Sequence, residues 1–454
     1  MVARASSLRR TGRYQFREPP APVITRPADL KELVDCVHPS SSFNAPFRPM
    51  GANSASTECN ASSAGTVIDM TGFDNILDID AYKDTVTVQA GVRLGTLADA
   101  LSEHGLELAG SHDLMDRTVG GAIAGGCIGP SIGEEGINFA SSVIELKIVT
   151  PTGQVAKIVD DNKKFLHAFR FSYGMLGIVY EATLKVRPIR EFVVTHRRCS
   201  IAQFAAAAES LAKTEIGIKF YLMPFRDRVY LDLRRYSDDA PASSRTPWKL
   251  KDWGESTVLP HIFKSISRVV PASSVRYRIM DEISSATQGI VNNRLVSSGS
   301  NSITRSRKPA KDKSKPLQYS SWLFPAADFA VVIQAYRDFC LQIQETSGFR
   351  CDMPTVGFRL SRDQSAMLSP SFEEPMIALR AVSTQTEGWE DFALDFAEFA
   401  EHWGGYPLFN ETRGMTIDHV ASVLAERSTC FRKFRRQLDP TNRMMNPFLS
   451  QYFL

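Results

Sequence analysis

The chain has 454 residues, of which 43% are hydrophobic and 23% are charged, and its formal net charge is +3. This length exceeds what one ordinary hydrophobic core accommodates, so we expect a globular protein of two domains. The nearly neutral charge gives no indication of a nucleic-acid partner, and no apolar run is long enough to predict a transmembrane helix.

The number and spacing of the cysteines indicate the redox environment in which the protein is expected to occur. The seven cysteines are scattered, with no CxxC pair and no spacing typical of a metal site. We therefore expect reduced thiols, no bound metal and a cytoplasmic location. The N-terminal stretch MVARASSLRRTGRYQF is basic and Ser-rich but lacks an apolar region, so it is not a secretory signal, and a short organelle presequence stays open as an alternative.

The first 190 residues predict a compact α+β domain. Apolar residues at helical spacing indicate helices over 27–38 and from Leu94 to about Gly105. Strands are predicted over 65–70, twice within 76–92, as a hairpin over 143–159, and in the later part of 169–189. The segment FRPMGANSAST, residues 47–57, is predicted as a glycine-containing loop.

The second half has a different composition. Residues 237–318 are rich in Ser, Lys and Arg, and we expect a mobile basic loop over about 294–316. The alternative is a lid that docks an anionic substrate or an anionic membrane surface. Further on, strands are predicted over 318–324 and 354–361, and helices over 326–340 and 389–403.

The stretch TVGGAIAGGCIGPSIGEEG, residues 118–136, holds seven glycines interspersed with apolar residues. A flexible linker has polar filler instead, so this stretch is predicted to be ordered. It is neither GxGxxG after a strand nor a P-loop. Together with the loop around Gly51 it gives one α+β domain two glycine-bearing loops, both able to offer backbone N–H groups to a diphosphate.

Several blocks, in this order and spacing, carry a family resemblance: PMGANSAS, VIDM, VTVQAGVRLGTLADAL, LAGSHDLMDRTVGGAIAGG and LGIVYEATLKV. They resemble the FAD-binding domain of the vanillyl-alcohol-oxidase-type flavoproteins. The second half, including the ending FRKFRRQLDPTNRMMNPF, is similar to the sugar-lactone and alditol oxidases, and equally to the decaprenylphosphoryl-ribose oxidases. The resemblance covers residues 20–190 well, 315–454 moderately, and the middle hardly at all.

The resemblance implies a two-domain α+β flavoprotein. It implies an FAD-binding domain over 20–190, a mixed α/β substrate or cap domain over 191–430, and a tail over 431–454 that returns to the FAD domain. FAD is expected to place its diphosphate on the loops 49–56 and 118–126, with its isoalloxazine facing the cap. The implied cofactor-binding residues are Pro49, Met50, Gly51, Ala52, Asn53, Ser54, Ala55, Ser111, Asp116, Thr118, Gly120, Gly121, Ala124, Gly125, Gly177, Ile178 and Val179.

The chain departs from the families it resembles at the flavin-tethering position and in the cap. Many relatives attach the flavin through a histidine of the first loop, where this chain has Asn53, so we expect noncovalent FAD. Of the alditol oxidases' Glu-x-Arg, His and Lys, the matching positions here hold Gly357 with Arg359, Arg380 and Asn410. Arg359, Arg380 and Asn410 are therefore the candidate catalytic residues, and the arginines cannot act as bases near neutral pH.

Other residues of interest have structural alternatives. His112 and Asp113 precede the glycine stretch, and Tyr319 and Tyr406 are candidate proton acceptors. His402 closes a helix, a position that histidine commonly takes for structural reasons. The Trp and Phe residues of 389–403 are expected to be core.

The sequence thus predicts an FAD-dependent oxidoreductase that transfers a hydride from a hydroxyl-bearing carbon of a sugar-like small molecule to flavin N5, with an anionic substrate as an open variant. One alternative is a biosynthetic flavoenzyme performing a different oxidation. Another is a flavin-binding protein that has lost catalysis. Peripheral membrane contact and the oligomeric state stay open.

Overall fold

The computed structural model describes residues 22–61, 65–108, 115–133, 138–159, 163–190, 192–212, 214, 216–236, 258–270, 273–290 and 317–454. The predicted mobile loop over 294–316 and residues 109–114 lie outside these ranges.

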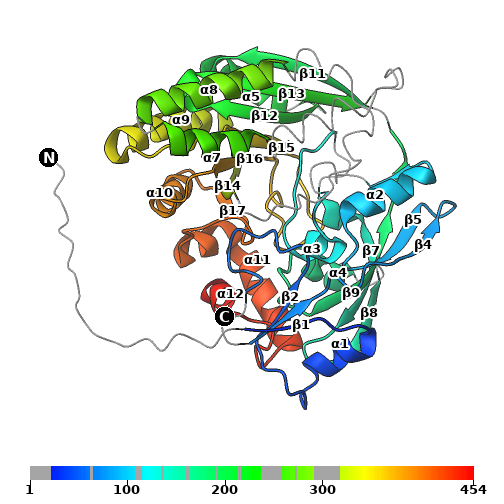
Figure 1. The fold of residues 1–454 in the computed structure, drawn as a ribbon. Coiled ribbons are helices and arrows are strands. Elements are labelled where there is room, and N and C mark those ends of the chain that lie inside the picture. The colour runs from blue at the N-terminus through cyan, green and yellow to red at the C-terminus, as the bar shows by residue number, and fades with distance from the viewer. Residues whose placement is uncertain are drawn as a thin grey trace, which may run out of the picture.

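The N-terminal part contains two main sheets (Figure 1). The first is parallel, in the order β1 (Val23–Thr25), β3 (Thr66–Asp69) and β2 (Phe47–Met50). The second is antiparallel, in the order β4 (Ile76–Asp80), β5 (Thr85–Gln89), β9 (Ile178–Lys185), β7 (Val143–Val149) and β8 (Val155–Val159). A short pair joins β6 (Leu106–Glu107) to β10 (Arg187–Pro188).

The helices of this part are α1 (Leu30–Val37), α2 (Leu94–Glu103), α3 (Val119–Ala124) and α4 (Lys163–Phe169). Two begin with side-chain caps, because Asp29 accepts a hydrogen bond from the amide of Glu32 and Thr118 accepts one from that of Gly121. The cap at Thr118 fixes the start of the glycine-rich segment beside the first loop.

The cap domain is built on a seven-stranded antiparallel sheet. Its order is β11 (Phe192–Cys199), β13 (Arg228–Tyr236), β12 (Gly217–Met223), β15 (Thr355–Leu360), β16 (Met376–Ser383), β14 (Gln318–Pro325) and β17 (Tyr406–Pro407). The cap helices are α5 (Ile201–Ala212), α7 (Leu259–Val269), α8 (Ser273–Ile290), α9 (Phe329–Ser347) and α10 (Trp389–His402), with a 3-10 turn over Pro224–Arg226.

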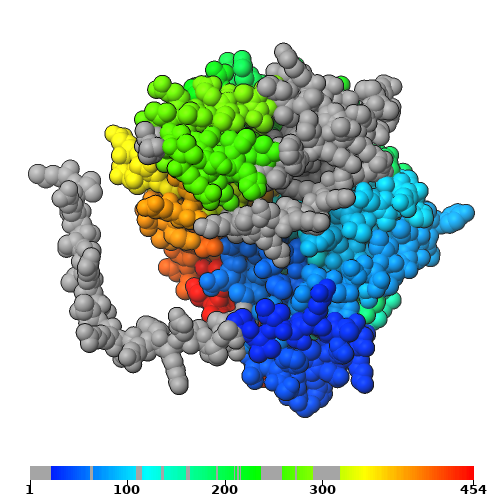
Figure 2. Space-filling view, viewed as in Figure 1, coloured from blue at the N-terminus to red at the C-terminus, as the bar shows by residue number. Residues whose placement is uncertain are grey.

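The two faces of this sheet have different neighbours. On one face, Phe220 of β12 packs against Phe204 of α5 and Phe329 of α9. On the other face, the hydroxyls of Tyr230 and Ser285 form a hydrogen bond that joins β13 to α8. Figure 2 shows α7 and α8 as the green outer surface of the cap on that side. The β14–β16 part of this second face meets the N-terminal part.

The C-terminal segment returns to the first sheet as α11 (Ile417–Leu438) and α12 (Pro447–Phe453), which lie between the two parts in Figure 1. The amide of Phe47 donates to the carbonyl of Arg443, and the Asn446 side chain donates to the carbonyls of Glu58 and Ala61. One hydrophobic cluster also runs through both parts, from Val86 to Trp322 and Phe453. The two domains therefore share a core.

The predicted α+β class and most predicted elements are confirmed, among them the hairpin over 143–159 and the apolar face of α10, where Trp389, Phe392 and Phe396 are buried. Three expectations were incomplete. Residues 47–50 form β2 instead of a loop, the Ser-, Lys- and Arg-rich segment contains α7 and α8, and α11 crosses the domain boundary proposed at 430/431. No helix in the described ranges is both long and apolar enough to cross a bilayer.

Candidate active site

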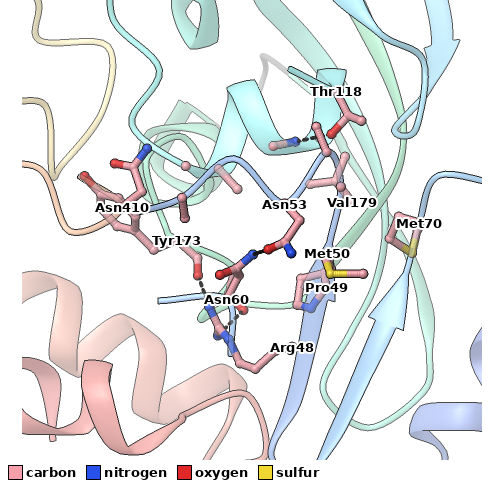
Figure 3. A pocket seen from close by; sticks show the side chains of 18 of the residues that line it. Arg48, Pro49, Met50, Asn53, Asn60, Met70, Thr118, Tyr173, Val179 and Asn410 are labelled. Carbon is pink, nitrogen blue, oxygen red and sulfur yellow. Dashed lines mark hydrogen bonds between the residues drawn. The ribbon is translucent and has the colours of Figure 1, made fainter. Parts of the chain in front are cut away.

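A cavity opens between the two glycine-bearing loops of the N-terminal part (Figure 3). It is lined by residues that follow β2, residues around α3, residues that precede β9, and Asn410 of the cap. Most of the predicted cofactor residues line it: Pro49, Met50, Gly51, Ala52, Asn53, Ser54, Ala55, Thr118, Gly120, Gly121, Ala124, Gly125, Gly177 and Val179. The structure thus brings together segments that the sequence holds more than 120 positions apart.

The glycines serve two purposes at this cavity. A Cβ atom on Gly51 would lie 2.1 Å from Oγ1 of Thr118, and one on Gly120 would lie 2.9 Å from the Cβ of Ala90, so these glycines let protein segments pack together. Gly121 is exposed, and a Cβ there would meet only Thr118 Oγ1, at 3.0 Å. Its open side therefore belongs to the cavity.

Arg48 is a buried cation in the wall of the cavity. Its guanidinium donates to the carbonyls of Met444 at 2.6 Å, Cys59 at 2.6 Å and Gly174 at 3.3 Å, and also to the carbonyl of Tyr173. Burial lowers its pKa to about 10. Arg48 therefore ties β2, the loop before β9 and the C-terminal segment together through backbone carbonyls.

Cap residues close one end of the cavity. Asn410 is 3% exposed, lines the cavity, and its Oδ1 has no hydrogen-bond partner within the described chain. Its backbone carbonyl accepts from the amide of Ser56 at 2.9 Å. The hydroxyl of Tyr319 on β14 donates to the carbonyl of Ser54. This end of the cavity is therefore the junction of the two domains.

A charged cluster centred on Glu411 lies at the same junction. Its carboxylate accepts from Arg117 of the N-terminal part at 2.8 Å, and from Arg380 and Ser321 of the cap at 2.7 Å each. Burial by itself would raise the pKa of Glu411, but the charges of Arg380 and Arg117 outweigh it and hold that pKa below its usual value. Glu411 is therefore ionised, with both oxygens engaged.

The two predicted catalytic arginines lie on opposite faces of the cap sheet. Arg380 pairs with Ser321 and Val356 across the strands and reaches Glu411 on the face toward the N-terminal part. Arg359 pairs with Ile377 and donates to the carbonyls of Thr214 and Ile216. Directly paired residues share a face, while neighbouring residues alternate. Arg380 and Asn410 therefore belong to the junction, and Arg359 does not join them.

Gly357 lies on the same face as Arg359, the helix-covered one. A Cβ atom there would lie 2.0 Å from Cζ of Phe220, whose ring fills the space. The packing of Phe220 therefore requires a glycine at this position.

The remaining predicted residues have these positions. Asp116 and Ile178 adjoin lining residues in the sequence but do not line the cavity themselves. The Asp116 carbonyl accepts a hydrogen bond from Arg93, and Ile178 is buried in β9. Ser111, His112 and Asp113 lie outside the described ranges. Tyr406 donates its hydroxyl to the Leu368 carbonyl, with burial raising its pKa to about 12, and His402 is exposed on α10.

Sequence reasoning missed several residues of the site. Glu411 and Arg117 are the most important, and the signal that could have found them is that each directly adjoins a predicted residue, Asn410 and Thr118. The cavity lining that was not predicted comprises Arg48, Cys59, Asn60, Met70, Ala90, Arg117, Tyr173 and Gly174. The cavity lining, as far as the structure describes it, includes no carboxylate and no imidazole.

Comparison with known proteins gives two matching families. Residues 21–158 match the FAD binding domain, and residues 182–452 match D-arabinono-1,4-lactone oxidase. The L-gulono-1,4-lactone dehydrogenase of Mycobacterium tuberculosis is 27% identical over 218 residues, which are 48% of this chain and 50% of that protein. In this match the chain spans about half the relative's length. The L-gulonolactone oxidase of Bos taurus is 22% identical over 441 residues, or 94% of each chain.

A solved structure shares the fold. A histidine-to-alanine mutant of cholesterol oxidase from Brevibacterium sterolicum superimposes with a TM-score of 0.76 at 14% identity, covering 95% of this chain and 94% of that one. The FAD binding domain profile, together with a glycine-lined cavity that presents the unpartnered Asn410 Oδ1, indicates FAD as the cofactor.

Proposed function

Because the chain belongs to the D-arabinono-1,4-lactone oxidase family, we propose that it oxidises a hydroxyl-bearing carbon of a sugar-like lactone by hydride transfer to bound FAD. The observation that carries this proposal is the junction itself. The cofactor cavity ends where the cap supplies Asn410, and Arg380 stands beside it in the cluster around Glu411. A substrate held by the cap domain therefore meets the end of the cavity that the cap closes.

Different residues of the cavity and its junction are assigned to binding the cofactor and to binding and orienting the substrate. FAD, when bound, supplies the acceptor for the hydride. Gly121 leaves its side of the backbone open to the nucleotide, and Asn410 offers an amide oxygen to a donor on the cofactor or the substrate. The Arg380 side chain keeps 26% of its surface exposed, so it is available to bind a substrate oxygen and to stabilise negative charge that develops there.

The groups around the junction are poor proton acceptors. Both oxygens of Glu411 are engaged by cations and by Ser321, and the Tyr319 hydroxyl already donates to Ser54. Burial raises the pKa of Tyr319, which keeps it protonated. We therefore propose that the cluster assists the reaction through charge and orientation.

We further propose that FAD is held noncovalently. Asn53 occupies the tethering position, takes a positive φ of 52°, and its side chain accepts from Asn60 at 3.0 Å. An amide cannot form the tether that a histidine forms. A cytoplasmic location and peripheral membrane contact stay predictions.

The proposed reaction is tested by mixing the purified holoenzyme anaerobically with sugar lactones, the matching open-chain polyols, and amines as controls, and following the visible absorption of oxidised flavin. We expect at least one lactone to bleach the flavin with saturation kinetics. Reduction by an amine alone would favour a different oxidation, and no reduction by any of them would favour a flavin-binding protein without catalysis.

A further inference from the structure

The carboxylate of Glu411 holds two cations that come from different domains. Arg117 reaches the carboxylate from the segment before α3, and Arg380 reaches it from β16. The Nε of Arg380 also donates to the hydroxyl of Ser321 at 2.9 Å. Glu411 is 1% exposed, so solvent screens these charges little. The two guanidinium groups and the carboxylate together carry one net positive charge.

This cluster borders the cap end of the cofactor cavity. Arg117 lines the cavity directly, and Glu411 follows Asn410, which also lines it. The reacting ring of FAD must be reachable from the substrate domain, so it has to occupy this end. Two-electron reduction adds negative charge to that ring when its N1 is deprotonated, and nearby cations therefore stabilise the reduced form.

We propose that Glu411 is a positioning residue that holds Arg117 and Arg380 as one charge-compensated cluster beside the flavin, and that it thereby sets the reduction potential of the bound FAD. The inference rests on the proposed function, since it requires FAD in this cavity. Without the carboxylate, two uncompensated cations would face the ring. Glu411 thus limits how readily the flavin accepts electrons.

The test compares the reduction potentials of the wild-type and Glu411→Gln holoenzymes. Each is reduced anaerobically with dithionite beside a reference dye, with no sugar present. We expect Glu411→Gln to shift the equilibrium toward reduced flavin by about tenfold or more, or about 30 mV for a two-electron couple. The matched control is Glu390→Gln, which removes an exposed carboxylate paired with Arg413 at 3.0 Å and should leave the potential unchanged.

Arg380→Met supplies the opposite change of charge. It should shift the equilibrium toward oxidised flavin by a similar factor. An unchanged potential in flavin-loaded Glu411→Gln overturns the inference. If Glu411→Gln does not retain FAD, Arg380→Met decides, and an unchanged potential there overturns it equally. If the potentials shift as expected but no lactone reduces the flavin, the proposed reaction fails and this inference stands.

Discussion

At the scale of single residues, substitutions of two adjacent glycines should have different effects, one on FAD affinity and the other on stability. Gly121→Ala adds a methyl group that meets only Thr118 Oγ1, so the protein should fold and lose FAD affinity. Gly120→Ala brings its methyl group to 2.9 Å from the Cβ and 3.3 Å from the carbonyl oxygen of Ala90, so it should lower the free energy of unfolding, by about 1–3 kcal/mol. Flavin fluorescence titration and urea unfolding of the flavin-free proteins separate these effects. Undiminished FAD affinity in Gly121→Ala would place the cofactor away from this loop.

The tethering position gives a second prediction at this scale. Since Asn53 stands there and the described lining holds no histidine, acid precipitation should leave the flavin in the supernatant. The measurement is the absorbance of the supernatant and of the redissolved pellet. Flavin in the pellet would reveal a covalent bond at another side chain, for which Cys59 and Tyr173 are nucleophiles in the described lining.

The predicted residues that line the cavity came from the resemblance to the FAD-binding domain, because the order and spacing of its glycine-bearing blocks are distinctive. Fourteen predicted residues line the cavity. The Glu411 cluster could not be predicted, because its members are separated by more than 260 positions between Arg117 and Arg380 and become neighbours only when the domains dock. The candidate role of Asn410 was predicted from its place in a pattern, while its charged neighbour was overlooked.

At the scale of elements, β15 explains why one predicted catalytic arginine stands apart. The sequence pattern predicts that residues 357 and 359 share a face, and the pairing with Leu379 and Ile377 agrees. Alternation alone does not tell which face meets the cofactor, because that depends on which helices cover the sheet. Phe220 and the helices α5 and α9 cover the face of Arg359.

Arg359→Met should therefore act on stability. Losing the contacts to the carbonyls of Thr214 and Ile216 should lower the free energy of unfolding by about 1–3 kcal/mol and leave the flavin reduction rate near that of the wild type. Arg362→Met, at an exposed position three residues further on and beyond the end of β15, is the control and should change stability less. A slow flavin reduction with normal stability would instead support the catalytic role predicted from the sequence.

At the scale of the whole molecule, the docking of the two domains should depend on pH through Glu411. Its pKa is lower in the folded protein than in the unfolded chain, so its contribution is complete above the unfolded value of about 4.3 and is lost as the pH falls through the folded value. Glu411→Gln should thus be less stable than the wild type by about 3–5 kcal/mol near neutral pH. That difference should shrink in acid.

Urea unfolding of both proteins across the acidic range measures this difference. The free energy of unfolding of the exposed Glu390→Gln variant should follow that of the wild type across the whole pH range. A gap between wild type and Glu411→Gln that stays constant from neutral to acidic pH would mean that the buried carboxylate is not ionised.

The path of the chain has a consequence for how the protein is made. Residues of the first domain leave the ribosome long before Asn410, Met444 and Asn446, which close the cavity and bind Arg48 and the loop after β2. Early domains generally fold as they emerge, but this one stays incomplete until residues near 446 have been translated. We therefore expect the cavity to hold flavin stably only after Asn410, Met444 and Asn446 have joined the first domain.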